Sequence, residues 1–83
     1  GLINFLRNVD GVEVAIFARE TAPEVTKVSF RARSGFDASA LARHFGGGGH
    51  AAAAGATLEL PLAEACDTVV AHVTGPFLEQ ENR

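Results

Sequence analysis

The amino-acid sequence predicts an α+β fold, in which a small mixed β-sheet of three to five strands carries helices packed mainly on one face. Three segments support this prediction. Val12 to Glu20 is rich in β-branched residues, and Val25 to Arg33 alternates apolar and polar side chains with the two-residue period of a strand. Leu62 to Val73 repeats apolar side chains at steps of three and one, which is the stripe of an amphipathic helix.

The size and composition of the chain suit one small domain that spans residues 1–83. Hydrophobic residues make up 47% of the chain, which is enough for a core without disulfides. Cys66 is the single cysteine, so no internal disulfide can form and we expect a reducing, cytoplasmic setting. The longest run without charge apart from one histidine, Phe45 to Leu58, is mostly Gly and Ala and is too weakly hydrophobic to span a membrane.

The N-terminal elements are predicted from the local pattern. Leu2 to Arg7 is apolar at four of its six positions and is interpreted as the end of a helix that begins upstream. Asp10-Gly11 is a turn signal that closes it. In the strand Val12 to Glu20, apolar residues occupy both faces, which is typical of an inner strand.

The second half of the chain is predicted to hold two helices and one more strand. Asp37 is a suitable N-cap for a short helix from Ala38 to Phe45. Ala56 to Leu60 is interpreted as a short strand, and Pro61 fits the first turn of the final helix. His72 is expected on the solvent side of that helix.

One face of the strand Val25 to Arg33 is basic. Lys27, Arg31 and Arg33 share this face with Ser29. Same-face residues in a strand are roughly 6.5–7 Å apart, close to the step between neighbouring phosphates on an extended single strand, so these side chains can track a short backbone. Arginine can also hold a phosphate through two parallel hydrogen bonds. The alternative is an ordinary solvated face of an antiparallel sheet.

A run of glycines followed by a histidine is the second candidate site. Gly46 to Gly49 lack a Cβ and can adopt positive φ, so their backbone amides can converge on an anion while a ligand lies against bare backbone. A helical turn in the alanines that follow would add free N–H groups, and His50 can donate a hydrogen bond to a phosphate or stack on a base. The alternative is a flexible spacer. The segment is neither a Walker loop, since no Gly-Lys-Ser/Thr follows, nor a dinucleotide fingerprint, since a helix is predicted before it.

The sequence predicts no catalysis by this chain alone. His44, His50 and His72 have no carboxylate or second histidine at a metal-ligand spacing. Cys66 lies on the apolar stripe of the last helix and is interpreted as an inert buried thiol. We therefore expect no catalytic residue and no metal ligand in this chain. The net charge of −3 also disfavours binding to long duplexes, which depends on a broad basic surface.

Three stretches of the sequence, taken in order, resemble a known family. They are Ser29-Phe30-Arg31, then Asp37-x-Ser39-x-Leu41-Ala42, then Phe45-Gly46-Gly47-Gly48-Gly49-His50-x-x-Ala53-Ala54-Gly55. This pattern is similar to the DHH-associated domain, the C-terminal lobe of RecJ-like and oligoribonuclease-like phosphoesterases, over about residues 9–73. Within that family, the chain looks most like the bacterial enzymes that degrade very short RNA and dephosphorylate 3′-phosphoadenosine 5′-phosphate.

The resemblance implies that binding and chemistry belong to two different lobes. In the family, the N-terminal lobe carries an Asp-His-His motif and holds two manganese ions, which clamp an in-line attack on a phosphodiester. No Asp-His-His triplet occurs in this sequence, so the resemblance implies a substrate-binding lobe cut away from its catalytic lobe. The residues implied to hold the nucleotide are Ser29, Arg31, Arg33, Gly46, Gly47, Gly48, Gly49 and His50, with Arg33 inferred from the face that it shares with Arg31.

The resemblance also implies partners, and it leaves alternatives open. The implied ligand is a short single-stranded RNA or DNA or a mononucleotide, the implied partner is the N-terminal lobe of the same polypeptide, and a homodimer of the full-length protein is compatible with both. One alternative is an RNA-binding appendage related to the C-terminal lobe of alanyl-tRNA synthetases, although the charge of −3 disfavours a folded tRNA. Another is a dimerisation module without ligand, whose Gly and Ala segments only permit close packing. A parent enzyme that acts on a cyclic dinucleotide or an inorganic polyphosphate is also compatible.

Overall fold

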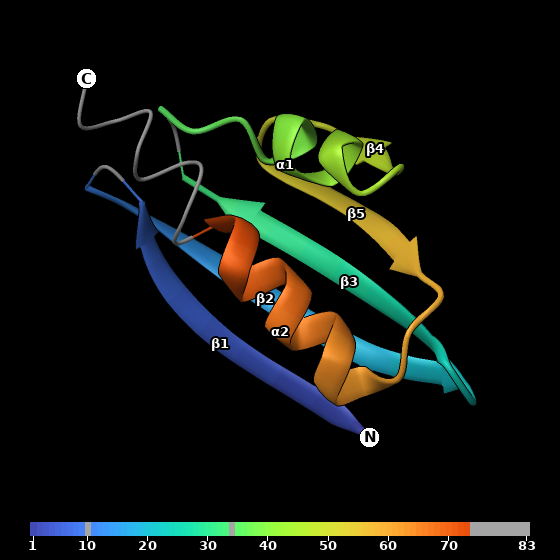
Figure 1. Ribbon diagram of the computed structural model, residues 1–83. Helices are drawn as coiled ribbons and strands as arrows, with labels where there is room; N and C mark the ends of the chain where they lie inside the picture. Colours follow the sequence, from blue (N-terminus) through green and yellow to red (C-terminus); the bar gives the residue numbers. More distant parts are fainter. Residues whose placement is uncertain (10, 34, 74–83) are drawn as a thin grey trace.

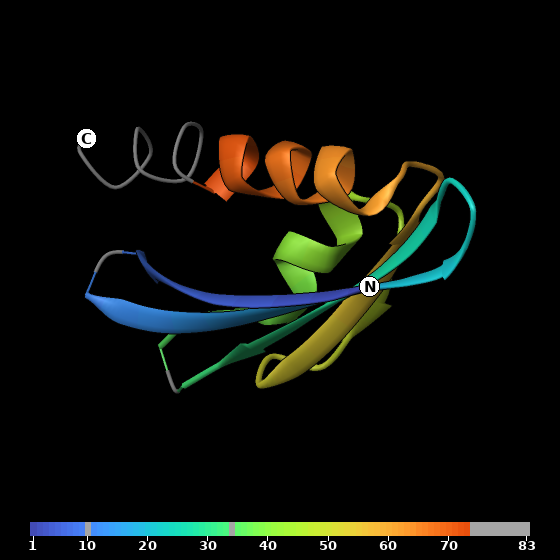
Figure 2. The same cartoon turned by 90° about the horizontal axis from the view of Figure 1, so that it is seen from below.

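The computed structural model describes residues 1–9, 11–33 and 35–73. Its elements, in chain order, are β1 (Leu2–Val9), β2 (Val12–Ala22), β3 (Val25–Ala32), α1 (Ala38–His44), β4 (Gly48–Gly49), β5 (Ala53–Leu58) and α2 (Leu62–His72). The five strands form one sheet in the order β1-β2-β3-β5-β4. Both helices lie on the same face of this sheet (Figure 1), and Figure 2 shows that neither of them covers the other face.

The α+β class, the number of strands and the one-sided packing of the helices are confirmed. All four strand pairings of the described residues are antiparallel, so the expectation of a mixed sheet is wrong. The reason lies in the connections, because β1, β2 and β3 follow one another through tight turns, which join antiparallel neighbours. β5 then runs antiparallel to β3, and β4 pairs with β5 through a hairpin.

Leu2 to Arg7 form most of strand β1, and the interpretation of this segment as the end of a helix is wrong. β1 and β2 pair along the whole of β1, as far as Val9 opposite Val12. Gly11 between them adopts φ 78°, which suits a two-residue hairpin. The other residue of the predicted turn, Asp10, lies outside the described residues. The apolar pattern of the segment suits either element, and the pairing with β2 selects the strand.

The core lies between the sheet and the two helices. Its buried apolar residues are Val14, Ile16, Ala18, Val28, Phe30, Ala38, Leu41, Ala42, Ala56, Leu58, Ala65, Val69 and Val73. Alternate residues of each strand contribute to it, so the intervening side chains point to the opposite side of the sheet. The alternation predicted for β3 and the apolar stripe predicted for α2 are confirmed. Within the described part of the chain, no helix has the length and apolar character needed to cross a membrane.

Both helices begin where the sequence predicts. The Asp37 carboxylate accepts hydrogen bonds from the backbone N–H and the hydroxyl of Ser39, and α1 starts at Ala38, directly after Asp37. This hydrogen bonding, above all that from the Ser39 hydroxyl, holds the pKa of Asp37 below its ordinary value. Helix α1 ends at His44, one residue before the expected Phe45, and Pro61 is the N-cap residue of α2.

The alanine run forms a hairpin, and the helical turn considered for it is absent. His50 and Ala53 exchange two backbone hydrogen bonds of 2.8 and 3.1 Å, so the chain reverses its direction through Ala51 and Ala52. The carbonyls of these two turn residues accept hydrogen bonds from backbone N–H groups at the start of α1 and the end of β3. Strand β5 therefore begins at Ala53, before the expected start at Ala56.

The end of α2 packs against the end of α1. His72 is half-buried and stacks on His44, with the ring centroids 3.4 Å apart, while Phe45 meets the His72 ring edge-on at 5.3 Å. The expectation that His72 faces solvent is therefore wrong. Burial, followed by the neighbouring His44, lowers the pKa of His72.

Candidate functional site

The side of the sheet that no described helix covers, here called the open face, is built from the strand residues that point away from the core (Figure 2). Its residues are Leu2, Asn4, Leu6 and Asn8 of β1; Glu13, Ala15, Phe17 and Arg19 of β2; Lys27, Ser29 and Arg31 of β3; Gly48 of β4; and Ala53, Gly55 and Thr57 of β5. Three of the eight predicted binding residues, Ser29, Arg31 and Gly48, thus lie on one surface.

The open face is positively charged although the chain as a whole is acidic. Arg19, Lys27 and Arg31 project from it, Arg33 follows β3, and Glu13 is the one acidic residue among the described strand residues of this face. The whole chain, in contrast, has ten acidic and seven basic side chains. The basic side chains are therefore concentrated where the helices leave the sheet uncovered, which suits a small anionic ligand.

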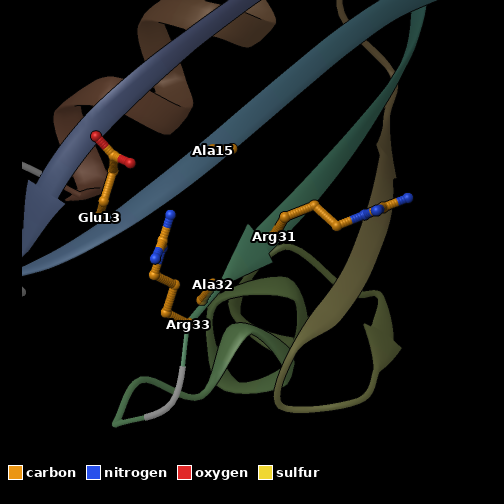
Figure 3. A pocket seen from close by; sticks show the side chains of 5 residues that line it. All are labelled: Glu13, Ala15, Arg31, Ala32 and Arg33. Atoms are coloured by element: carbon orange, nitrogen blue, oxygen red, sulfur yellow. The ribbon is translucent and has the colours of Figure 1, made fainter.

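A shallow hollow at one end of the open face is lined by Glu13, Ala15, Arg31, Ala32 and Arg33 (Figure 3). Glu13 and Arg33 lie on the same side of the hollow, whereas Arg31 extends away from them across β5. The backbone thus brings Arg31 and Arg33 to one hollow and directs their guanidinium groups to different sides. Arg31 does not line the hollow beside the glycine segment, which is described next.

A second hollow lies beside the glycine segment. It is lined by Lys27, Gly46, Gly47, Gly48, Gly55, Ala56 and Thr57. Lys27 is exposed and its cross-strand partner is Thr57, so an ammonium group and a hydroxyl stand beside bare backbone. The alternation of β3 already placed Lys27 on the basic face, but the residues implied by the family resemblance did not include it. No signal in the sequence pointed to Thr57.

Gly46 and Gly47 close the C-terminus of α1. Gly46 adopts φ 84°, and its N–H donates to the carbonyl of Arg43 at 3.0 Å, while the N–H of Gly47 donates to the carbonyl of Ala42 at 2.9 Å. These two bonds form a Schellman motif, which favours a glycine in the left-handed conformation. Because both N–H groups are bonded to helix carbonyls, they do not converge on an anion as the glycine run led us to expect.

Gly47 and Gly49 are required by close packing against β5. A Cβ on Gly47 would lie 2.7 Å from the Cα of Ala56 and closer still to the carbonyl oxygen of Gly55. A Cβ on Gly49 would lie 2.5 Å from the Cα of Ala54, and Gly49 also has φ 145°. The sheet therefore leaves no room for a side chain at either position.

Gly48 differs from its neighbours, because no feature of the described fold requires a glycine there. Apart from Gly48 itself and its two chain neighbours, no residue has an atom within 4 Å of a Cβ at this position, the residue is exposed, and its φ is not positive. Gly48 pairs with Gly55, so two residues without side chains lie next to each other on the open face. The missing side chain at Gly48 keeps the hollow beside Lys27 open, so that a ligand can lie against backbone.

Ser29 lies between the two hollows. It is half-buried, and its cross-strand partners are Phe17 on β2 and Gly55 on β5. Because Gly55 in turn pairs with Gly48, and Phe17 with Asn4, these five residues form one row across the open face, which we name the central row. Phe17 is one of the apolar residues that occupy the second face of the strand predicted from Val12 to Glu20, and nothing in the sequence pattern marked it as a site residue.

His50 lies outside both hollows. Its side chain is exposed, and its backbone N–H donates to the carbonyl of Ala53 at 2.8 Å, which fixes the hairpin between β4 and β5. The structure therefore brings Lys27 and Thr57 to the glycine segment, and it leaves His50 at the margin of the open face.

The described residues offer no metal centre. No group of three His, Cys, Asp or Glu side chains among them is placed to hold a metal ion, so this part of the chain does not fit the manganese pair expected of the family's N-terminal lobe. Cys66 is a half-buried free thiol on α2. Burial, followed by the Asp67 carboxylate, raises the pKa of this thiol, which keeps it protonated and a poor nucleophile near neutral pH.

One protein family matches almost the whole chain. Residues 1–75 match the DHHA1 domain. The chain belongs to this family. The match spans every helix and strand described above, including β1 and α2. It confirms the resemblance that the Ser29-Phe30-Arg31 stretch and the Gly-His segment carry.

A curated relative of this DHHA1 chain is the bifunctional oligoribonuclease and PAP phosphatase NrnA of Thermus thermophilus, which is 44% identical over 69 residues. The aligned region is 82% of this chain and 21% of the relative, so the DHHA1 chain spans about a fifth of the relative's length. The similarity supports an accessory domain of a DHH phosphoesterase.

Proposed function

We propose that this DHHA1 chain is the substrate-binding C-terminal lobe of a DHH phosphoesterase that hydrolyses short oligoribonucleotides, 3′-phosphoadenosine 5′-phosphate, or both. The name of the Thermus relative combines an oligoribonuclease with a PAP phosphatase, which supports this substrate class. In this proposal the open face holds nucleotide phosphate, and the chain contributes no catalytic group.

The main support for the proposal is that no feature of the described fold requires a glycine at position 48. Its neighbours Gly46, Gly47 and Gly49 are explained by a helix cap and by close packing, but Gly48 has open space where its side chain would be. A glycine without a structural reason, beside the cationic Lys27 in one hollow, suits direct contact between a phosphate and the backbone.

The other predicted residues take roles that follow from their positions. Arg31, which extends across β5, supplies a second cation on the open face, and Arg33 supplies another in the hollow that both arginines line. Ser29 offers a hydroxyl between them on the central row. His50, at the margin, adds a ring donor for a phosphate or a surface for a base. Gly46, Gly47 and Gly49 act indirectly, because they hold the segment in shape.

The distribution of charge favours a short single strand over a duplex. The open face offers a few cations within one sheet, whereas a long duplex is bound through many neutralised phosphates along a broad surface. A mononucleotide or a short oligonucleotide fits within the area of the open face, and the acidic remainder of the chain repels a longer polyanion.

The chemistry belongs, in this proposal, to an N-terminal DHH lobe of the same polypeptide with two manganese ions. That lobe and the open face would enclose the substrate between them, in a protein that acts in the bacterial cytoplasm. The free thiol of Cys66 supports a reducing compartment.

The proposal is tested by titrating the isotopically labelled 83-residue chain with 5′-phosphorylated diadenylate and with 3′-phosphoadenosine 5′-phosphate, followed by NMR. We expect saturable amide shifts at Lys27, Gly48 and Gly55. Lys27→Ala should weaken binding about ten-fold, the effect of one charge-assisted hydrogen bond. The charge-matched control is Arg43→Ala, which removes a cation from α1 and should leave the affinity unchanged.

Gly48→Ala provides the sharpest variant, because it should weaken binding without changing the fold. Equal affinity in Gly48→Ala and the unchanged chain would contradict the role of the glycine segment. An absence of any saturable shift, combined with a concentration-dependent dimer, would favour the dimerisation module instead. Hydrolysis of a phosphodiester by the purified chain with manganese would overturn the separation of binding and chemistry.

A further inference from the structure

Phe17 is an exposed aromatic ring on the open face. Its side chain is 40% accessible although β2 is an inner strand of the sheet. Its cross-strand partners, Asn4 and Ser29, are short polar residues that leave the ring uncovered. An uncovered ring at such a position is available to a planar ligand.

Cationic residues lie at neighbouring positions of β2 and β3, and the Arg31 side chain extends away from the ring, across β5. Arg19 follows Phe17 at the next same-face position of β2, and Lys27 and Arg31 stand on either side of Ser29 along β3. An aromatic ring on a sheet, with cations around it, is the arrangement by which proteins bind single-stranded nucleic acids, since bases stack on the ring while phosphates lie near the cations.

We propose that Phe17 stacks against a nucleobase of the bound oligonucleotide, which runs along the central row from Gly48 to Phe17. The inference rests on the proposed function and adds a second subsite to it. Between Gly48 and Phe17 the central row has little side-chain bulk, because Gly55 has no side chain and that of Ser29 is short. A strand that is held at Gly48 by a phosphate can therefore lie flat across β5 and β3.

The distance from Gly48 to Phe17 along the central row sets the length of the ligand. Neighbouring strands are about 4.8 Å apart, so the three strand steps from β4 to β2 span about 14 Å. An extended nucleotide step is similar to the repeat of same-face residues, roughly 7 Å. A mononucleotide held at Gly48 therefore does not reach Phe17, whereas the third nucleotide of an oligonucleotide does.

The surroundings of Phe17 favour a nucleobase over a protein partner. Leu2 and Leu6 of β1 are also exposed on this face, and a protein surface would have to cover them together with the cations next to Phe17. A nucleic acid has both components that this face offers to bind, a planar base for the ring and a phosphate for each cation.

The test uses the absence of tryptophan and tyrosine from the chain. Phe17→Trp introduces a single fluorescent reporter, which is titrated with 5′-phosphorylated oligoadenylates of one, two, three and five nucleotides. We expect quenching by the oligomers of three and five nucleotides and none by the mononucleotide at saturation. The control is Ala63→Trp, an exposed position on α2 on the other side of the sheet, whose emission should stay constant.

Affinity provides the second readout. Phe17→Ala should weaken binding of the five-nucleotide ligand about five-fold or more, the usual effect of losing one stacked base, and should leave mononucleotide binding unchanged. Phe17→Leu keeps the apolar surface without the ring, so it should behave like Phe17→Ala. Equal affinity of the Phe17→Leu and unchanged chains would overturn stacking.

The failure of this inference is distinguishable from that of the proposed function. If mononucleotides bind at Gly48 but longer oligomers bind no more tightly and do not quench the tryptophan of Phe17→Trp, the stacking subsite is refuted and the phosphate site stands. If no nucleotide binds, both are refuted. Emission that changes with protein concentration and not with oligonucleotide would assign this face to a contact between copies, which also overturns the inference.

Discussion

Two adjacent glycines, Gly47 and Gly48, should respond in opposite ways to the same substitution. A Cβ on Gly47 would meet the Cα of Ala56 at 2.7 Å and the carbonyl of Gly55 closer still, and these are backbone atoms of a paired strand that cannot move aside alone. Overpacking of this kind costs about 1–3 kcal/mol. Gly47→Ala should therefore destabilise the fold, even though it adds only one methyl group.

Gly48→Ala should cost nothing, because a Cβ there has open space and φ needs no glycine. The substitution also reduces the conformational freedom of the unfolded chain, which stabilises a protein by about 0.4–1 kcal/mol where the backbone is compatible. We therefore expect Gly48→Ala to melt at or slightly above the temperature of the unchanged chain.

Thermal unfolding followed by circular dichroism measures the difference. For a domain of this size, 1 kcal/mol corresponds to a shift of about 4–8 °C in Tm, so Gly47→Ala should melt about 6–30 °C below Gly48→Ala. A third variant, Gly46→Ala, should fall between them, since its left-handed φ of 84° costs an alanine about 1–2 kcal/mol. Equal destabilisation in Gly47→Ala and Gly48→Ala would refute the assignment of Gly48 to ligand binding, because both glycines would then be structural.

Three further perturbations follow from the core and the titratable groups. Burial lowers the pKa of His72, so below the ordinary value of 6.5 the unfolded chain binds more protons than the folded chain, and the free energy of unfolding should fall as pH falls. In His72→Gln, the free energies of unfolding measured with urea at pH 7 and at pH 5 should therefore differ less than in the unchanged chain. Leu41, fully buried in α1, should cost about 2–5 kcal/mol when replaced by alanine, and a change of under 1 kcal/mol by urea unfolding would contradict the described core. Cys66, whose thiol pKa is raised by burial, should react slowly with a thiol reagent at pH 7.5 and faster in urea; equal rates would show that the thiol is not protected.

The parts of the fold that the sequence predicts are those with a local cause. Alternation in β3 depends on neighbouring residues only, as does the N-cap that Asp37 provides for α1. The segment Leu2 to Arg7 has no such local cause, because its apolar pattern suits a helix and a strand equally, and only the pairing with β2 selects the strand. The alanines are good helix formers, and yet Ala53 and Ala54 lie in β5, because its pairing with β3 and β4 outweighs their local preference.

The candidate site shows the same division between local and distant causes. The alternation of β3 predicts its basic face, and it places Lys27 on the same face as Arg31. The sequence could not predict the different structural role of each glycine, since the positive φ of Gly46 and the lack of room at Gly47 depend on where α1 and β5 lie. Nor could the sequence predict that Phe17 lies on one row with Gly48, because that depends on the register of four strands.

Phe30 and Arg31 show why this architecture can carry a binding surface at little cost to stability. They are adjacent in β3, but Phe30 is fully buried against the helices and Arg31 is exposed on the open face. Phe30→Ala should cost about 3–5 kcal/mol, since it removes a large core ring, whereas Arg31→Ala should change stability by no more than about 0.5 kcal/mol. Of these two substitutions, only Arg31→Ala should lower the nucleotide affinity while the chain remains folded. Loss of folding in Arg31→Ala would show that the guanidinium supports the sheet, and the strict separation of core and binding residues by strand alternation would then be wrong.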